Sequence, residues 1–516
     1  MKRLSFLLLF AVTAVVSAPG QTQRPNILFI LADDMGWQDT SVAFAKERTK
    51  FNDRFHTPAL ERLAREGMKF TQAYSCAVCS PTRVSFLTGQ NAARHGVTQW
   101  THITGDKPTP DLPHPTLSHA AWNWNGLQPV GSGLPHSVEA PTLPALLKES
   151  GYRTMHFGKG HFGAAGTPGA DSRVFGFDVR IGGRDAGGCG SYSGLKNFGA
   201  KAHPNGPWRA WDLDHYFGQD IHLTEALTLE AKREIRSAVE AKVPFFCYFA
   251  HYAPHTPIEP DERFAPKYRA AGLDETEAAY ASLLEGMDKS VGDLLDLLDE
   301  LGIAENTLVV FTSDNGAVSH KYRTMDPPHT HNAPLSSGKG AHHEGGIRVP
   351  LLVRWPGVAK AAAVNESSVI IYDWFPTLVK VSGALAPDHL DGLDLAPLFA
   401  EAEAPTAFSR PLVWHFPNFW GPLSAPGPVE GPGMGPSSTI RRGDWKLIYR
   451  HGDQSFELFD LANDLGETHN LAKQQPERVR DLAAELSKIL REHQAPMPIV
   501  KATGTALPLP DKPPIP

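Results

Sequence analysis

The sequence predicts an α/β protein in which a large, mostly parallel β-sheet precedes a smaller α+β subdomain. Continuous apolar runs, typical of strands buried on both faces, alternate with amphipathic helical patterns. The length of 516 residues suits one large domain with an appendage. After about residue 404 a Pro/Gly-rich passage leads into short strands and a helix. We place the large domain at 25–403, the subdomain at 404–495 and a Pro-rich tail without regular structure at 496–516.

Six apolar runs predict the strands of the large sheet. The first, Asn26–Ala32, is apolar at almost every position, as a strand covered on both faces requires. A helix and a second strand follow it, an order that indicates parallel pairing. The further strands are expected at Lys69–Tyr74, Tyr152–Phe157, Val243–Ala250, Thr307–Thr312 and Leu351–Arg354.

Capping residues and apolar periodicity mark the helices. Thr57 is expected as the N-cap and Pro58 as the first residue of a helix that Gly67 ends. The longest helix is expected over Asp274–Leu301, where apolar residues recur every three or four positions. Other helices are expected at Cys79–Gly89, Leu143–Ser150, Tyr372–Leu385 and Pro476–His493, and the subdomain strands at Thr439–Arg441, Trp445–Tyr449 and Glu457–Asp460.

Two predicted strands end in carboxylates. Asp33 and Asp34 follow the first strand, and Asp314 and Asn315 follow the strand that ends near Thr312. In open α/β sheets ligands bind at the carboxyl ends of the strands, so these groups suggest a cation site; an Asp-Gly-like turn is the alternative for the first pair. Hard oxygen ligands favour Ca²⁺ or Mg²⁺ over zinc.

Cationic and titratable side chains occupy further turns, several of them flanked by glycine or proline. With the carboxylates, they suit a divalent cation and a cationic cradle around one small tetrahedral oxyanion. They are Arg83, Lys159, His161, His255 and Lys339.

The segment Cys79–Gly89 places a small thiol one helical turn before Arg83. Such a unit can hold a reactive group beside an anion; the alternative is a buried cysteine in the first turn of a helix. Cys76 and Cys79 also form a C-x-x-C, which is compatible with a redox motif or half a zinc site. No second C-x-x-C is present, and neither role needs Arg83. Four cysteines are too few for a disulfide scaffold.

Charge and the N-terminal residues bear on partners and location. The formal net charge of −7, without blocks of like charge, argues against a nucleic-acid partner. Basic residues, an apolar run from Leu4 to Val16 and small residues near Ala18 predict a signal peptide over 1–18. No later apolar run reaches about 18 residues, so we expect a periplasmic or secreted protein without a membrane anchor.

Aromatic and histidine residues suggest carbohydrate contacts. The long loop from Trp100 to Pro141 is rich in tryptophan, and indole faces stack on sugar rings, although surface packing is the alternative for any one of them. A histidine at a strand end often has only a structural role. For the His342-His343 pair, the alternative to sugar binding is a local feature of the sequence without a function. The candidate substrate contacts are His251, His342, His343, Trp100, Trp414 and His415.

Together these motifs resemble those of the type I, formylglycine-dependent sulfatases of the alkaline-phosphatase-like superfamily, in particular the secreted polysaccharide sulfatases of bacteria. The resemblance runs from Asn26 to about Leu471. Its signature is Cys79-x-Pro81-x-Arg83 with Leu87-Thr88-Gly89. Supporting matches are Asp33-Asp34, Gly158-Lys159-x-His161, Pro254-His255-Thr-Pro257, Asp314-Asn315-Gly316, Gly338-Lys339-Gly340, Glu344-Gly345-Gly346-x-Arg348-Val-Pro350, Arg442-Gly-Asp-Trp-Lys-Leu447 and Glu457-Leu-Phe-Asp-Leu461.

The resemblance implies a fold, a modification and a metal. The fold is a large mixed, mostly parallel sheet sandwiched by helices, with a C-terminal α+β subdomain of an antiparallel sheet and a helix. A formylglycine-generating maturation enzyme would oxidise Cys79 to formylglycine (3-oxoalanine), whose hydrate is the nucleophile. An oxygen of residue 79 would join Asp33, Asp34, Asp314 and Asn315 in binding one Ca²⁺, with Mg²⁺ as second choice.

The resemblance also implies roles for the cationic residues. Arg83 would hold and activate the hydrated aldehyde, and Lys159 and Lys339 would hold sulfate oxygens. His255 would protonate the leaving oxygen, and His161 would be the base of the elimination step. Lys339 is an alternative acid, because a lysine among other cations can have a lowered pKa.

The expected activity is hydrolysis of a sulfuric ester on a sulfated saccharide, and the general resemblance suggests a galactose-type 4-sulfate. Alternatives are a phosphonate or phosphodiester hydrolase on the same fold, an arylsulfatase of broad specificity, and a carbohydrate-binding protein that keeps Cys79 as a thiol. The chain departs from the family pattern at Gly160, where a bulky residue is usual, and we expect a wider pocket there. Gln90 replaces a commonly basic residue, which we expect to matter little.

Overall fold

The computed structural model describes residues 24–101, 113–202, 204, 206–318, 331–400, 406–420 and 434–512. The predicted signal peptide, part of the Trp-rich loop and part of the Pro/Gly-rich passage lie outside these residues. Among the helices of the described ranges, none combines the length and the apolar character that crossing a membrane requires.

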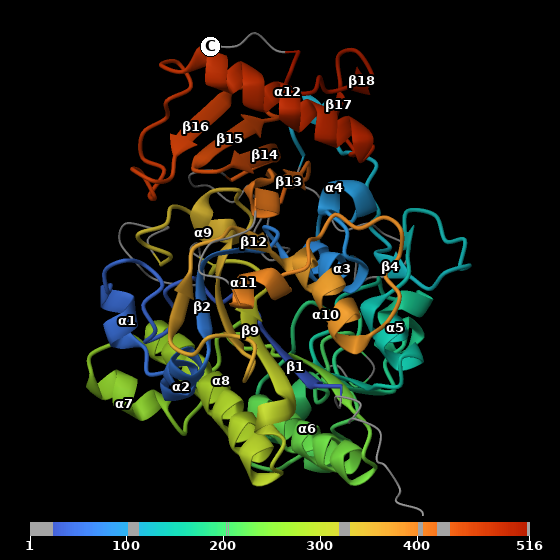
Figure 1. Ribbon diagram of the computed structural model, residues 1–516, viewed down its shortest axis with the longest axis vertical. Coiled ribbons are helices and arrows are strands. Elements are labelled where there is room, and N and C mark those ends of the chain that lie inside the picture. The colour runs from blue at the N-terminus through green and yellow to red at the C-terminus, as the bar shows by residue number, and fades with distance from the viewer. Residues whose placement is uncertain are drawn as a thin grey trace, which may run out of the picture.

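The main sheet has nine strands within the described residues, and the first strand, β1, lies near its centre (Figure 1). Every pairing is parallel except those of β10, which runs antiparallel to both its neighbours. The prediction of a mixed, mostly parallel sheet is confirmed. In sheet order the strands are β11 (Ala363–Asn365), β2 (Met68–Tyr74), β10 (Arg348–Arg354), β9 (Thr307–Ser313), β1 (Asn26–Ala32), β8 (Phe245–Ala250), β6 (Arg153–Gly158) and β7 (Val179–Gly182), with β12 (Val369–Ile370) paired to β2.

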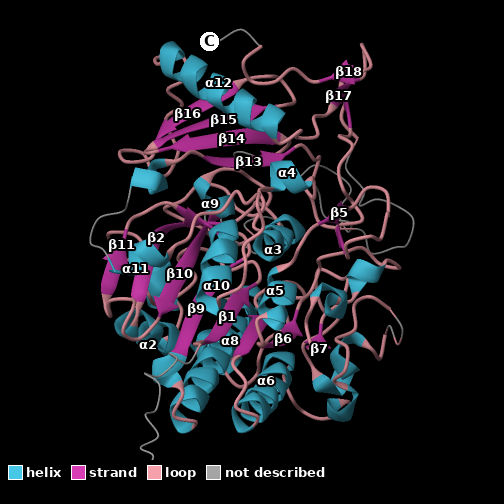
Figure 2. Ribbon diagram, turned by 45° about the vertical axis from the view of Figure 1, so that its right-hand side comes forward, coloured by secondary structure: helices cyan, strands magenta, loops and turns pink. Residues whose placement is uncertain are grey.

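Helices cover both faces of this sheet (Figure 2). Alternate residues of β1 pack into two separate hydrophobic cores, because successive side chains of a strand point to opposite faces of the sheet. Leu28 and Ile30 pack with α2 (Pro58–Glu66), α6 (Leu223–Glu240) and α8 (Glu275–Glu300). Residues Ile27 and Phe29 pack with α3 (Cys79–Thr88), α5 (Leu143–Glu149), α10 (Trp374–Ser382) and α11 (Ala396–Ala400). Shorter elements in the connections are α1 (Lys50–Arg54), α4 (Ala92–His95), α7 (Ala265–Ala270), α9 (Glu344–Ile347), β4 (Leu127–Gln128) and β5 (Val138–Glu139).

The start of α2 differs from the prediction in its capping partner. The helix begins at Pro58 as expected, but the Thr57 side chain does not cap it. The carboxylate of Asp288 in α8 instead accepts the N–H groups of Ala59 and Leu60, at 2.9 and 2.8 Å. Thr57 Oγ1 accepts the Ser41 N–H at 2.9 Å. A tertiary contact has therefore replaced the local cap.

The subdomain contains an antiparallel sheet covered by one helix, at the top of Figure 1. Its strands are β13 (Leu412–Phe416), β14 (Ser437–Arg442), β15 (Trp445–Arg450) and β16 (Phe456–Asp460), and its helix is α12 (Pro476–Glu492). Its attachment to the main domain includes the fully buried Lys446, whose Nζ lies 3.0 Å from Glu344 Oε1 and 2.8 Å from Glu467 Oε1. A buried ion network of this kind specifies one docking geometry.

The expectation of a tail without regular structure is wrong. In the tail, β17 (Ile499–Val500) pairs antiparallel with β18 (Thr505–Ala506) and with β3 (Leu117–Ser118), which lies in the long loop after α4. The residues between the prolines still carry backbone N–H groups, and these can form the hydrogen bonds of short strands. A high proline content alone does not show whether such pairs form.

Three buried histidines of the subdomain interface should make stability depend on pH. His342 Nδ1 lies 2.9 Å from Ser437 Oγ, while His415 and His451 share Ser438 Oγ at 2.8 and 2.9 Å. Burial lowers the pKa of His415 to about 4 and that of the other two further below the ordinary value. Between the folded value and the unfolded value of about 6.5, the folded chain binds fewer protons, so stability present above pH 6.5 is lost as the pH falls.

We expect the free energy of unfolding to be lower at pH 5 than at pH 7, because each such histidine contributes a loss of up to about 1.4 kcal/mol per pH unit once the pH is below about 6.5. Denaturant titrations at both pH values measure this. The variant His415→Asn should show a shallower pH dependence, whereas replacing the exposed His469 should leave it unchanged. Equal slopes for wild type and His415→Asn would contradict the prediction.

Candidate active site

The carboxylates lie at the ends of two adjacent parallel strands. Strands β1 and β9 pair in a register that places Ala32 opposite Ser313, so Asp33 and Asp34 emerge beside Asp314. The Asp34 N–H donates to Asp314 Oδ1 at 3.2 Å. The ends of β1 and β9 therefore bring the three carboxylates together at one edge of the sheet.

Two lysines approach these carboxylates from neighbouring elements. Lys159 follows β6, and its Nζ lies 2.6 Å from Asp33 Oδ2. Lys339 Nζ lies 2.7 Å from Asp34 Oδ1. Gly158 allows the close approach of β6 to β8, because a Cβ there would lie 1.8 Å from the carbonyl oxygen of Ala250. Both lysine side chains are buried, so their charges act with little screening.

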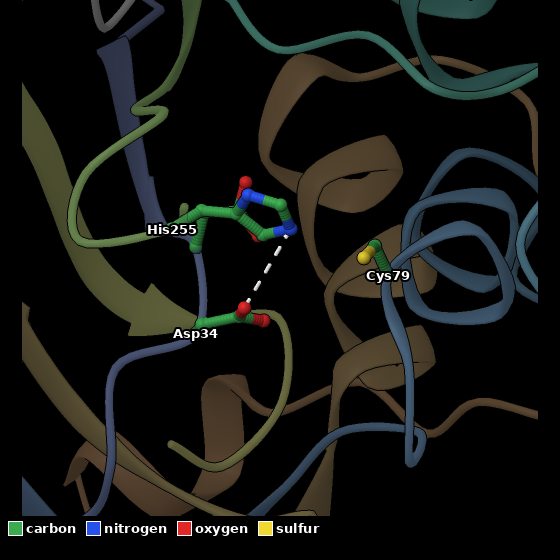
Figure 3. A group of neighbouring side chains, drawn as sticks. Asp34, Cys79 and His255 are labelled. Atoms are coloured by element: carbon green, nitrogen blue, oxygen red, sulfur yellow. Dashed lines mark ion pairs between the residues drawn. The ribbon is translucent and has the colours of Figure 1, made fainter. Parts of the chain in front are cut away.

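The helix α3 supplies the thiol and the guanidinium. It begins at Cys79 and ends before Gly89, whose φ of 68° is in the left-handed region. Arg83 is fully buried: its Nη2 lies 2.8 Å from Asp314 Oδ2, and its Nη1 donates to the Lys159 carbonyl at 2.9 Å. Figure 3 shows the Cys79 sulfur directed toward the His255 ring and Asp34.

The oxygen atoms at this site fit a divalent cation. Asp33 Oδ1 and Asn315 Oδ1 are buried without a hydrogen-bond partner among the described residues, a costly arrangement that a cation would relieve. Asp33, Asp34, Cys79 and His255 offer ligand atoms that all lie within 4.8 Å of one another. His255, whose Nε2 is 3.6 Å from Asp34 Oδ2, was expected only as a proton donor. Carboxylate and amide oxygens favour a hard cation.

The acidic groups are held in unequal charge states. Burial, with the repulsion of Asp314, raises the pKa of Asp33 well above its ordinary value. Burial would also raise the pKa of Asp34, but Lys339 and His255 outweigh it and lower that pKa. Burial raises the pKa of the Cys79 thiol, which the lysines only partly oppose. The encoded cysteine is therefore a protonated thiol at neutral pH and a poor nucleophile.

The basic groups correct one expectation. Lys339 was considered as an acid with a lowered pKa; burial acts in that direction, but the attraction of Asp34 raises its pKa above the ordinary range. Burial lowers the pKa of His255 to about 3, with Lys159 contributing, and it lowers the pKa of His161 further. The free site thus holds two neutral imidazoles and a charged Lys339.

Gly160 does not widen the pocket as we expected. A Cβ at Gly160 would lie 2.6 Å from the carbonyl oxygen of Arg184, which also accepts the His161 N–H at 2.7 Å. The backbone of a neighbouring loop therefore occupies the space of the missing side chain. His161 itself has a φ of 60°, held by that hydrogen bond.

Five of the six predicted sugar contacts are buried structural residues, which corrects the prediction. Trp414 Nε1 donates to the Ser75 carbonyl at 2.8 Å, and His415 and His342 bond to serines of β14. His343 packs edge-on against Phe459, and His251 lies beside Phe249 inside the main domain. Trp100 is half-buried.

Sequence reasoning missed Trp420, which lies against the Lys339 turn. A Cβ at Gly340, whose φ is 91°, would lie 2.3 Å from the Trp420 ring. This half-buried indole therefore borders the cationic cradle, next to a glycine that cannot be replaced without displacing it. Its position after Trp414 in a Pro/Gly-rich passage carries no signal that separates it from the other tryptophans.

Two family models match the chain. The model described as Sulfatase matches residues 25–384, and the model described as N-sulphoglucosamine sulphohydrolase, C-terminal, matches residues 338–496. The first covers the main sheet and every cradle residue, and the second covers the antiparallel sheet and α12.

Relatives and a solved structure match over nearly the whole chain. A sulfatase of Formosa agariphila is 30% identical over 99% of this chain and 98% of its own length. The N-acetylgalactosamine-6-sulfatase of Mus musculus is 30% identical over 92% of this chain and 87% of its own. The crystal structure of Ps i-CgsB in complex with k-i-k-neocarrahexaose has a TM-score of 0.70 at 25% identity, covering 92% of this chain and 94% of that one. The chain therefore belongs to the sulfatase family of sulfuric ester hydrolases.

Proposed function

We propose that the protein removes sulfate from a sulfated carbohydrate, using a formylglycine made from Cys79 by a maturation enzyme and a bound Ca²⁺. The observation that supports this most is the convergence of Arg83, Lys159 and Lys339 on the residue at the start of α3, beside three carboxylates. Two of the similar proteins support a carbohydrate substrate by their names: one is an N-acetylgalactosamine-6-sulfatase, and the other is a structure in complex with k-i-k-neocarrahexaose. We further propose that residues 1–18 direct export.

Two groups would supply chemistry that the encoded side chains lack. A hydrated aldehyde at position 79 offers one hydroxyl as nucleophile and a second whose deprotonation releases sulfate, so no water has to reach the sulfur. A Ca²⁺ held by Asp33, Asp34, Asp314 and Asn315 would add positive charge beside the sulfate oxygens. The unpartnered oxygens of Asp33 and Asn315 support this ligand set.

The remaining residues would position substrate and move protons. Lys159 and Lys339 bind sulfate oxygens, and their charges stabilise the negative charge that develops on the leaving oxygen. Arg83, anchored on Asp314, orients the nucleophile. Burial and the lysine charges lower the pKa of His255; the incoming sulfate offsets those charges, so the imidazole takes up a proton from solvent and delivers it from Nε2 to the leaving oxygen. Neutral His161 accepts a proton in the release of sulfate.

Matched esters test the proposal against its alternative of phosphoryl transfer, because sulfate and phosphate differ little in shape. We expect kcat/KM for 4-nitrophenyl sulfate to exceed that for the phosphate and phenylphosphonate analogues by at least about 100-fold, a difference of about 2.7 kcal/mol in transition-state binding. Galactose-type saccharides sulfated at position 4 or position 6 should release sulfate faster still. Faster hydrolysis of the phosphorus esters would overturn the assignment as a sulfate-ester hydrolase. Activity on aryl sulfates but on no sulfated saccharide would overturn the proposal of a carbohydrate substrate.

A further inference from the structure

A loop that follows β7 covers the two active-site histidines. Its Gly183 N–H donates to the Gly158 carbonyl at 2.6 Å, and its Arg184 carbonyl accepts the His161 N–H at 2.7 Å. A Cβ at Gly187 would lie 2.6 Å from the His161 ring, and one at Gly188 would lie 3.3 Å from the His255 ring. Arg184 is thus joined by its backbone to the sulfate cradle.

The Arg184 side chain lies on an aromatic ring. Its guanidinium carbon is 4.9 Å from the centroid of Trp211, and that of Arg209 is 4.7 Å from the same ring. Trp211 is fixed to the end of β7, because it exchanges two backbone hydrogen bonds with Gly182, at 2.9 and 2.6 Å. Arg184 and Trp211 are both part-exposed, so the pair is accessible beside a rigid strand end.

Arg184 differs from its neighbouring arginines in having no carboxylate partner among the residues that the structure describes. Arg209 pairs with Asp214 at 2.5 Å, and Arg180 pairs with Asp212 at 2.9 Å. Among the described residues, no carboxylate lies within ion-pair distance of Arg184, whereas Arg180 and Arg209 each have one. The Arg184 guanidinium therefore lies on the indole without a neighbouring carboxylate to offset its charge.

We propose that Arg184, held against Trp211, binds a second anionic group of the substrate, a carboxylate or a further sulfate ester next to the one that is cleaved. The planar guanidinium matches either group with two parallel hydrogen bonds, and the indole offers a face for the sugar ring that carries it. This inference rests on the proposed carbohydrate substrate and narrows it to polyanionic saccharides.

Substrates that differ by one anionic group test the role of Arg184. On saccharides that carry a uronate or a second sulfate beside the scissile sulfate, Arg184→Ala should raise KM about 10- to 100-fold with a smaller change in kcat. Arg184→Lys should restore part of that loss. On a saccharide whose only charged group is the scissile sulfate, and on 4-nitrophenyl sulfate, KM and kcat of both variants should stay within about twofold of the wild-type values. Comparing the uronate and disulfated substrates identifies which anion is bound.

The controls separate this inference from the proposed function. Arg173→Ala removes an exposed arginine that pairs with Asp171, and it should leave every substrate unaffected. An equal loss on singly and doubly charged substrates would overturn the inference and mark Arg184 as a structural support of His161. Absence of aryl sulfatase activity in the wild type would instead overturn the proposed mechanism. Unchanged KM for all charged saccharides in Arg184→Ala would also overturn the inference.

Discussion

Replacing Cys79 by alanine is expected to lower kcat/KM for sulfate esters by about 10⁴-fold or more, because it removes the precursor of the nucleophile. The buried thiol, whose pKa is raised, is poorly suited to attack in its encoded form. Protein from its native host, or co-produced with a maturation enzyme, should therefore carry an aldehyde at this position. Mass spectrometry of the peptide spanning residue 79 and sulfate-release assays measure the two expectations.

Cys76 is the matched control for this prediction. It lies three residues earlier, is also buried, and contacts Ser85 Oγ at 3.9 Å instead of the cradle. Cys76→Ala should keep most activity and the aldehyde at position 79. A native protein that is active with an unmodified thiol at position 79 would disprove the formylglycine mechanism, while leaving the family membership intact.

Removing the divalent cation is expected to cost both activity and stability. Without it, three buried carboxylates and two unpartnered oxygens remain in the cradle. Ca²⁺ at about 100 times its Kd should add about 2.7 kcal/mol to the free energy of unfolding, because only the folded chain presents the ligand set. Thermal unfolding and sulfate release, measured after chelation and after addition of Ca²⁺ or Mg²⁺, test this, and Ca²⁺ should restore more than Mg²⁺.

Variants connect the metal response to its ligands. Asn315→Leu keeps the side-chain volume but removes the unpartnered oxygen, and it should weaken Ca²⁺ binding at least about 10-fold. Asp288→Asn alters a buried carboxylate whose hydrogen bonds go to the start of α2 and not to the cradle, and it should change stability without changing the Ca²⁺ response. A chelated wild-type protein with full activity and an unchanged unfolding temperature would contradict the metal assignment.

Strongly patterned elements were predictable from the sequence. The run Asn26–Ala32 forms β1 at the predicted residues, and α8 begins at Glu275 with Asp274 as its cap. The helix α6, Leu223–Glu240, was not predicted although Leu223, Ala226 and Leu227 repeat at helical spacing and are buried. Its alanines and charged residues give a weaker contrast between faces than the leucines of α8.

The candidate site was predictable where its residues stand at strand ends in distinctive turns. Asp33, Asp314 and Lys159 follow apolar runs directly, and parallel pairing brings such ends together. Substrate contacts were not predictable in this way. Trp414 and Trp420 are alike in sequence, yet one donates a hydrogen bond inside the core and the other borders the Lys339 turn.

The sequence by itself determined the α/β class, the positions of the strongest strands and helices, and the residue types of the cradle. Only the tertiary structure decided that Arg83 pairs with Asp314, 231 positions away, and that Arg184 approaches His161 beside Trp211. The physical reason is the range of the forces involved. Periodicity and capping act within one or two turns of chain, whereas the partner of a buried charge is set by the order in which strands pair.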